Sequence, residues 1–104
     1  MADRVALVTG GGRGIGRAIA LALASEGLAV AVGARTSADV EQTADAARRL
    51  GAKALALTLD ATEADSLGAA VERVGRELGP IDVLVNNAGV AESAPFARTE
   101  AYMN

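Results

Sequence analysis

The chain is organised around one segment, Thr9-Gly10-Gly11-Gly12-Arg13-Gly14-Ile15-Gly16-Arg17. Four glycines within five residues would weaken the interior of a strand or a helix, so they indicate a turn that needs unusual dihedrals or a close approach to another group. The apolar run Val5–Val8 enters this turn, and an Ala/Leu/Ile segment leaves it. Strand, glycine turn and helix, in this order, direct free backbone N–H groups at a phosphate. The segment therefore predicts a phosphate-binding loop; the alternative is a glycine turn with no ligand.

The spacing of the glycines distinguishes between kinds of phosphate loop. The dinucleotide pattern G-x-G-x-x-G is absent, because Ile15 or Arg17 stands where its third glycine is needed. A Walker loop is disfavoured as well, because Arg17-Ala18 replaces the lysine and the serine or threonine. The pattern that fits is T-G-x-x-x-G-x-G, from Thr9 to Gly16.

Apolar runs and helical spacing alternate along the rest of the chain. Continuous apolar runs are typical of buried parallel strands, and apolar residues three and four apart are typical of helices. The expected strands are Val5–Val8, Leu28–Val32, Ala54–Leu59 and Asp82–Val85. The expected helices run from about Ile15 to Glu26, from a cap at Thr36 to about Leu50, and from a cap at Thr62 to Leu78.

The ends of these helices carry their own signals. Thr36 and Asp39 have the spacing of a capping box, and so do Thr62 and Asp65, so we expect each threonine to cap the helix that follows. Glycines are expected just past the three helix ends, at Gly27, Gly51 and Gly79.

The order βαβαβαβ predicts an α/β fold whose parallel sheet is covered on both faces. A loop follows through Pro95, and residues 97–104 could begin a further helix. Because an open sheet that stops after four strands is typical of part of a larger domain, we expect residues 1–104 to be one domain at most, and an incomplete one.

Composition excludes several function classes. The net charge of −3 is spread along the chain with no basic cluster, which argues against a nucleic-acid partner. The absence of cysteine and histidine removes thiolate chemistry and the commonest metal ligand, so no metal site is expected. The N-terminus lacks a signal peptide pattern, and no apolar run approaches the roughly 18 residues of a membrane span. We therefore expect a soluble, cytoplasmic protein without a membrane partner.

Three motifs in order resemble those of the short-chain dehydrogenase/reductase family. They are the loop Thr9–Gly16, Asp60 at the end of the third expected strand, and Asn86-Asn87-Ala88-Gly89 after the fourth. The resemblance covers essentially all of this chain but half or less of a family domain. It implies a Rossmann-like, doubly wound parallel sheet, of which residues 1–104 form the N-terminal, NAD(P)-binding part.

The resemblance also implies which residues bind the coenzyme. The backbone of the loop glycines would approach the pyrophosphate, with Ile15 over the coenzyme, and Thr9 would brace the loop against the N-N-A-G segment. Asp60 would accept a hydrogen bond from the adenine amine, and Asn87 would line the adenosine ribose. The full predicted set is Gly10, Gly11, Gly12, Arg13, Gly14, Ile15, Gly16, Arg35, Asp60, Ala61, Asn87, Ala88 and Gly89. Two alternatives stay open: Asp60 could instead cap the next helix, and Asn86 and Asn87 could instead tie strands four and one together.

Charge favours NADP over NAD. A carboxylate that would bond the ribose 2′-hydroxyl is expected about 18 residues beyond Gly16, where Ala34 stands. Next to it is Arg35, and the loop contributes Arg13. Two guanidinium groups suit a 2′-phosphate, and the family places basic residues at these positions in its NADP-preferring members. Asp39 is the nearest carboxylate, and we expect it to cap the helix rather than compete.

The family's catalytic residues are missing from these 104 residues. The family uses a Tyr-x-x-x-Lys pair with a serine upstream and an asparagine on the fourth helix. Tyr102 is the single tyrosine, the sole lysine is Lys53, and Asn104 falls short of the catalytic asparagine. We therefore assign no catalytic residue here.

The expected function is that of an NAD(P)-dependent oxidoreductase, which reduces a ketone or oxidises a secondary alcohol by hydride transfer. This chain would supply the coenzyme-binding part, and the resemblance implies a small-molecule carbonyl or alcohol substrate and a homodimer or homotetramer at full length. The alternative is a non-catalytic nucleotide-binding or regulatory module made of the half-fold alone.

Overall fold

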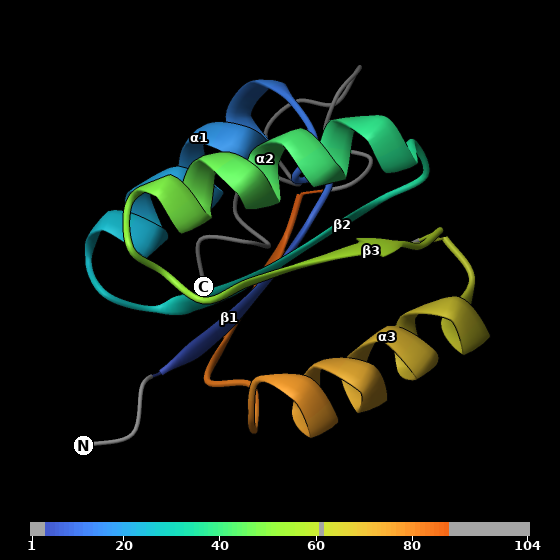
Figure 1. The fold of residues 1–104 in the computed structure, drawn as a ribbon. Helices are drawn as coiled ribbons and strands as arrows, with labels where there is room; N and C mark the ends of the chain where they lie inside the picture. The colour runs from blue at the N-terminus through green and yellow to red at the C-terminus, as the bar shows by residue number, and fades with distance from the viewer. Residues whose placement is uncertain (1–3, 61, 88–104) are drawn as a thin grey trace.

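The computed structural model describes residues 4–60 and 62–87, and these form an alternating series of strands and helices (Figure 1). The elements are β1 (Val5–Thr9), α1 (Gly14–Ser25), β2 (Ala29–Ala34), α2 (Ser37–Arg49), β3 (Ala54–Thr58), α3 (Ala64–Glu77) and β4 (Val83–Asn86). The predicted order βαβαβαβ is confirmed. The helix start expected within 97–104 lies outside the described residues. Within 4–60 and 62–87, no helix combines the length and the apolar character that a membrane crossing needs.

The four strands are parallel and lie in the order β3-β2-β1-β4. The chain adds β2 and β3 on one side of β1 and then returns to place β4 on the other side. Helices α1 and α2 cover one face of the sheet, and α3 covers the opposite face (Figure 1). This is the predicted doubly wound, Rossmann-like arrangement.

Strand β1 lies at the centre of the core and is buried along its whole length. Its side chains alternate between the two faces, as the two-residue period of a strand requires. Val5 and Leu7 pack with Ala70 and Val74 of α3. On the other face, Ala6 and Val8 pack with small side chains of α1 and α2, which are Ala20, Ala24, Ala44 and Ala47. Small helix residues bring the helices close to the sheet, so this core needs few large side chains.

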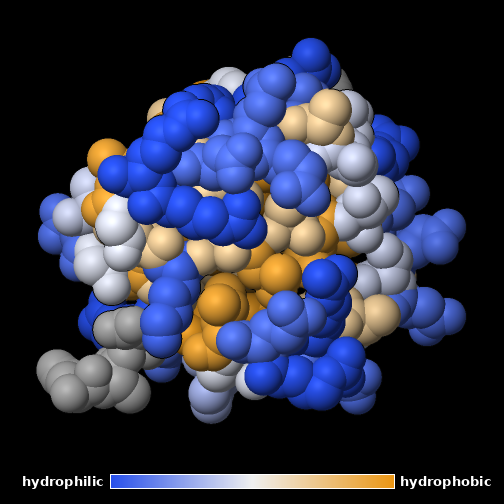
Figure 2. Space-filling model, viewed as in Figure 1, coloured by the Kyte–Doolittle hydropathy of each residue, from blue (hydrophilic) through white to orange (hydrophobic). Residues whose placement is uncertain are grey.

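The apolar layer between the helices reaches the surface at the edges of the sheet. Figure 2 shows apolar side chains between the α2 layer and the α3 layer, with hydrophilic side chains over the outer faces of both helices. At the other edge, β4 alternates between half-buried and exposed residues, and Leu84 is 49% exposed. In the described part of the chain β4 pairs only with β1.

The ends of the helices agree only partly with the sequence predictions. Gly27, Gly51 and Gly79 each follow the C-cap residue of a helix with a positive φ, which confirms the three predicted stops. Both predicted capping boxes are wrong. Thr36 is the N-cap of α2 but makes no side-chain cap bond, and the N-cap of α3 is Glu63 rather than Thr62.

Candidate functional site

The predicted site lies at the carboxyl ends of β1 and β4. The connections from β1 lead away on one side to β2 and β3, whereas β4 lies on the other side, so the strand order reverses between β1 and β4. Ligands of open α/β sheets bind in the crevice outside such a reversal. The glycine loop follows β1 and Asn87 follows β4, so both lie at the reversal of strand order where folds of this kind bind their ligands.

The glycine loop leaves β1 through a turn that only glycine adopts without strain. Gly10 has φ of 69° and Gly14 has φ of 61°. The N–H groups of Gly10 and Gly11 both donate to the carbonyl oxygen of Gly33 in β2, at 2.7 and 3.3 Å. The start of the loop is therefore held to the neighbouring strand.

The rest of the loop presents a row of open backbone donors. The first hydrogen bond of α1 runs from Arg17 N–H to the carbonyl of Arg13 at 3.3 Å. The N–H groups of residues 12–16 donate to no acceptor in the part of the chain that the structure describes. Consecutive open N–H groups at a helix N-terminus form a binding site for an anion. This arrangement can hold a phosphate or pyrophosphate group without a basic side chain.

Close packing explains the other glycines of the loop. A Cβ on Gly16 would overlap the carbonyl oxygen of Gly10 and would lie 2.8 Å from Nδ2 of Asn87. A Cβ on Gly12 would lie 2.7 Å from Cβ of Asp39 in α2, and one on Gly11 would touch Val32 at 3.0 Å. The loop therefore packs closely against β2, α2 and the end of β4, and these three glycines leave no room for a side chain.

Thr9 ties the loop to β4, as the sequence predicted. This side chain is 1% exposed, and its hydroxyl donates to Oδ1 of Asn86 at 2.9 Å and accepts from the N–H of Asn87 at 3.0 Å. Nδ2 of Asn87 lies 3.5 Å from the carbonyl oxygen of Gly10, at the limit of a hydrogen bond. The structural tie between strands four and one, left open above, is therefore present.

We expect Thr9→Val to lower the free energy of unfolding by about 1–2 kcal/mol, because valine removes a buried hydroxyl and with it the part-buried hydrogen bonds to Asn86 and Asn87. Thr58→Val is the matched control, since Thr58 is an exposed residue at the end of β3, and it should change the unfolding free energy by less than about 0.5 kcal/mol. Urea denaturation measures both. Equal losses in the two variants would contradict a tie through the hydroxyl.

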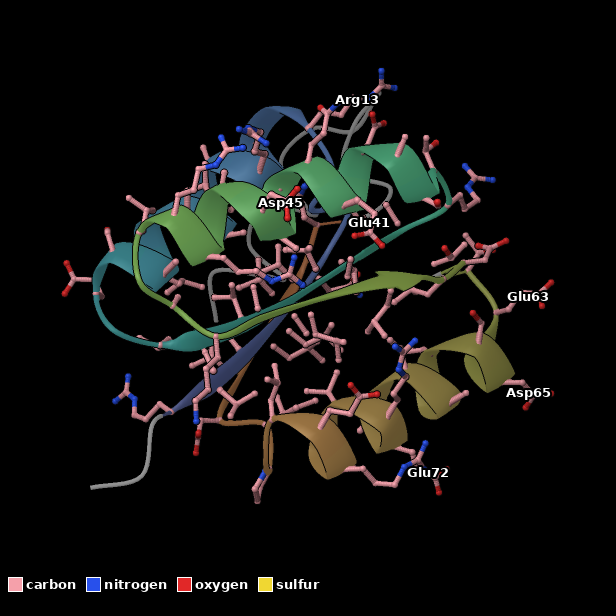
Figure 3. The ribbon with its side chains drawn as sticks, in the orientation of Figure 1. Arg13, Glu41, Asp45, Glu63, Asp65 and Glu72 are labelled. Carbon is pink, nitrogen blue, oxygen red and sulfur yellow. The ribbon has the colours of Figure 1, made fainter. Side chains whose placement is uncertain are left out.

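Arg13 and Arg35, the two arginines predicted to bind the 2′-phosphate, lie at the start of α1 and directly after β2. Arg13 is the N-cap residue of α1, and its side chain is 86% exposed. Figure 3 shows it at the surface, on the same side of the sheet as α2, while Asp65 and Glu72 of α3 and the N-cap residue Glu63 lie on the other side. Arg35 directly follows β2 and is exposed.

The position of Asp39 corrects the prediction that it only caps its helix. Oδ2 of Asp39 lies 3.8 Å from Nε of Arg13, and the Asp39 side chain is 31% exposed. Asp39 therefore faces Arg13 as an ion-pair partner, in the first turn of α2, where the helix dipole favours a negative charge. An exposed pair at this distance contributes little stability, so Arg13 remains available to a stronger anion.

Asp60 is held by the start of the next helical segment. Its Oδ1 accepts hydrogen bonds from the hydroxyl of Thr62 at 2.6 Å and from the N–H of Thr62 at 3.0 Å. The hydrogen bonds from the Thr62 hydroxyl and then from the Thr62 N–H hold the pKa of Asp60 below its ordinary value. Desolvation opposes them, and the charge of Arg35 lowers the pKa by a lesser amount. The capping alternative is thus correct in part. Asp60 accepts the backbone N–H of Thr62 just before α3, but the N-cap residue of that helix is Glu63.

This pKa is open to a direct test. Because the pKa of Asp60 is lowered in the folded state, its ionised form stabilises the fold above the unfolded pKa, and that contribution is lost as the pH falls through the folded pKa. Thr62→Val removes the hydroxyl donor, so we expect the pKa of Asp60 to rise, whereas Thr62→Ser should keep it low. Carbon-13 NMR titration of the Asp60 carboxyl checks this, and an unchanged midpoint in Thr62→Val would refute the assigned cause.

Sequence reasoning missed a polar contact between α2 and the loop. The buried Thr43 of α2 donates to the carbonyl of Gly12 and accepts from Nη1 of Arg17, both at 3.2 Å. The signal was present, because Val40, Thr43 and Ala47 share the apolar stripe of α2, where a threonine is unexpected.

Some predicted residues lie outside the part of the chain that the structure describes. They are Ala61, Ala88 and Gly89, together with Tyr102 and Asn104. Residues 4–60 and 62–87 contain no group of acidic side chains that could hold a metal ion.

The family model described as "short chain dehydrogenase" matches residues 4–102. The short-chain reductase protein NovJ of Streptomyces niveus is 48% identical over 88 residues, which are 85% of this chain and 34% of that protein. The chain likewise spans about a third of the length of a short chain dehydrogenase from Pseudocercospora fijiensis and of a dehydrogenase from Sinomonas cyclohexanicum. A short-chain dehydrogenase/reductase homolog from Bacillus subtilis is matched over 92% of its length at 34% identity.

Two solved structures share the fold. A putative short-chain alcohol dehydrogenase from Sinorhizobium meliloti has a TM-score of 0.81 at 40% identity, and the match covers 91% of this chain and 38% of that one. An alcohol dehydrogenase from the archaeon Thermococcus sibiricus, complexed with 5-hydroxy-NADP, has a TM-score of 0.73 at 38% identity and is matched over 78% of this chain and 35% of its own.

Proposed function

The chain belongs to the short-chain dehydrogenase/reductase family, and we propose from this that residues 1–104 are the N-terminal part of an NAD(P)-binding domain in an oxidoreductase. The observation that carries the proposal is the row of open N–H groups at residues 12–16, next to the reversal of strand order between β1 and β4. The names of the relatives, which are dehydrogenases and reductases, favour an enzyme over a non-catalytic module.

The backbone of the glycine loop would hold the pyrophosphate of the coenzyme. Ile15 stands beside the loop with 62% of its surface exposed, and a coenzyme lying over it would cover this apolar side chain. Asp60 would accept from the adenine amine, and Asn87 would line the ribose. Ala61, Ala88 and Gly89 stay predictions of the same kind.

NADP is the coenzyme that we favour. Ala34 places no carboxylate at the end of β2, Arg35 stands two residues before α2, and Arg13 faces Asp39 in the first turn of that helix. A 2′-phosphate carries more negative charge than the Asp39 carboxylate, and two guanidinium groups can bind it at the same time. The bound 5-hydroxy-NADP of the Thermococcus sibiricus relative is in line with this choice.

The reaction would be the reduction of a carbonyl or the oxidation of a secondary alcohol in a small molecule. The coenzyme, when bound, would supply the hydride as NADPH in the reduction or accept it as NADP⁺ in the oxidation. The described residues bind and orient it, and the groups that move the proton would come from parts of the protein beyond those described. We further propose that the full-length protein is a cytoplasmic homo-oligomer.

Titration of the protein, expressed from its full reading frame, with NADPH and with NADH tests the proposal. Nicotinamide fluorescence should show saturable binding of both coenzymes, with NADPH binding more tightly. A folded protein that binds neither would refute the proposed function, and one that prefers NADH would refute the choice of NADP alone.

A further inference from the structure

Thr43 is a polar side chain in the apolar stripe of α2. It is fully buried, and the buried residues on either side of it in the stripe are Val40, Ala44 and Ala47. A valine has nearly the same shape and would suit this position without the cost of burying a hydroxyl. The hydroxyl therefore needs a specific partner to be stable here.

The partners of that hydroxyl both belong to the glycine loop and the helix that follows it. The hydroxyl has one hydrogen, and it donates this hydrogen to the carbonyl oxygen of Gly12 at 3.2 Å, 31 residues away in sequence. A threonine within a helix commonly bonds the carbonyl four residues earlier in its own helix, and here its hydrogen is used on the loop instead. Nη1 of Arg17 donates to the same hydroxyl at 3.2 Å.

The bond to Gly12 also sets the direction of the next donor in the loop. The carbonyl of Gly12 and the N–H of Arg13 belong to one planar trans peptide, so they point in opposite directions. With the carbonyl held by α2, the N–H of Arg13 points away from α2. This N–H is one of the open donors of residues 12–16.

A second contact from the same face of α2 keeps the loop in place. Asp39 lies one turn before Thr43, its Cβ is 2.7 Å from the position that a Cβ on Gly12 would take, and its carboxylate faces Arg13. Helix α2 therefore contacts the loop at the successive residues Gly12 and Arg13. Of the two contacts, only that of Thr43 with Gly12 is a buried hydrogen bond.

We propose that Thr43 is a positioning residue of the glycine loop, which aligns the open N–H groups for the pyrophosphate of the coenzyme. This rests on the proposed function, because it takes that row of donors as the pyrophosphate site. Since both coenzymes carry the pyrophosphate, Thr43 acts on NADPH and NADH alike, unlike the two arginines.

The test compares Thr43→Val, which removes the hydroxyl and keeps the shape, with Thr43→Ser, which keeps the hydroxyl. In the full-length protein we expect Thr43→Val to raise the dissociation constants of NADPH and NADH by about tenfold each, with their ratio unchanged, and Thr43→Ser to restore both to within about threefold of wild type. Wild-type affinities in Thr43→Val, or an equal loss in Thr43→Ser, would overturn the proposal.

Amide hydrogen exchange in the coenzyme-free protein is the second measurement. The amides of Gly10 and Arg17 form the bonds at the two ends of the loop, and both should exchange about tenfold faster in Thr43→Val while the amides of α3 keep their rates. Unchanged rates at the loop, or an equal rise throughout the chain, would overturn the proposal. If the wild-type protein binds neither coenzyme, the proposed function fails, and this measurement still decides whether Thr43 holds the loop.

Discussion

Gly16→Ala is expected to reduce kcat/KM for the coenzyme by about 100-fold or more. We expect no other glycine-to-alanine change in the loop to reduce it further. The added Cβ would overlap the carbonyl oxygen of Gly10 and lie 2.7 Å from its carbonyl carbon. Backbone atoms cannot rotate aside as the end of a side chain can, so α1 must move away from β1. A displacement of about 1 Å at a binding group is enough for a loss of this size.

The chain offers a matched control in Gly75→Ala. Gly75 also lies inside a helix, α3, and a Cβ there would meet nothing within 4 Å. Alanine in an open helical position stabilises a helix by roughly 0.5–1 kcal/mol relative to glycine, so this variant should melt slightly higher and keep its coenzyme affinity. Steady-state kinetics and thermal melting on both variants separate the effect on the loop from the effect on the helix. If Gly16→Ala kept wild-type kcat/KM, the loop would not be packed as the structure has it.

Arg35→Asp is expected to shift the preference between NADPH and NADH by about 100-fold toward NADH, which corresponds to roughly 2.7 kcal/mol. The change removes a guanidinium group that would bind the 2′-phosphate, and it places a carboxylate where one can repel the phosphate and accept from a 2′-hydroxyl. It also takes away a positive charge that helps to lower the pKa of Asp60. The ratio of kcat/KM for the two coenzymes is the measurement.

Arg49→Asp controls for the change in net charge. Arg49 is exposed in the last turn of α2, at the opposite end of that helix from Arg35. It should leave the coenzyme ratio within about twofold of wild type, because a charge more than a Debye length away is screened by salt. An equal shift in both variants would show a general charge effect, and no shift in Arg35→Asp would remove the argument for a phosphate clamp.

Local patterns in the sequence were sufficient for the elements of the fold. Apolar runs identified all four strands, because strands of a parallel sheet that lies between helices are rich in apolar residues on both faces. Positive φ at Gly27, Gly51 and Gly79 followed from glycine's freedom from a Cβ clash. The caps were less predictable, since a threonine before a helix can bond to several groups, and the hydroxyl of Thr62 binds Asp60 instead.

The sequence by itself determined the order of strands and helices, the glycine loop, and the family, since each depends on residues close together in the chain. Only the tertiary structure decided which distant residues meet there. Thr9 bonds to Asn86 because β4 pairs with β1, and Thr43 bonds to Gly12 because α2 packs against the loop. The same packing turned Asp39 toward Arg13. Contacts such as these depend on how whole elements bury their apolar faces against one sheet, and no pattern within a single element contains that information.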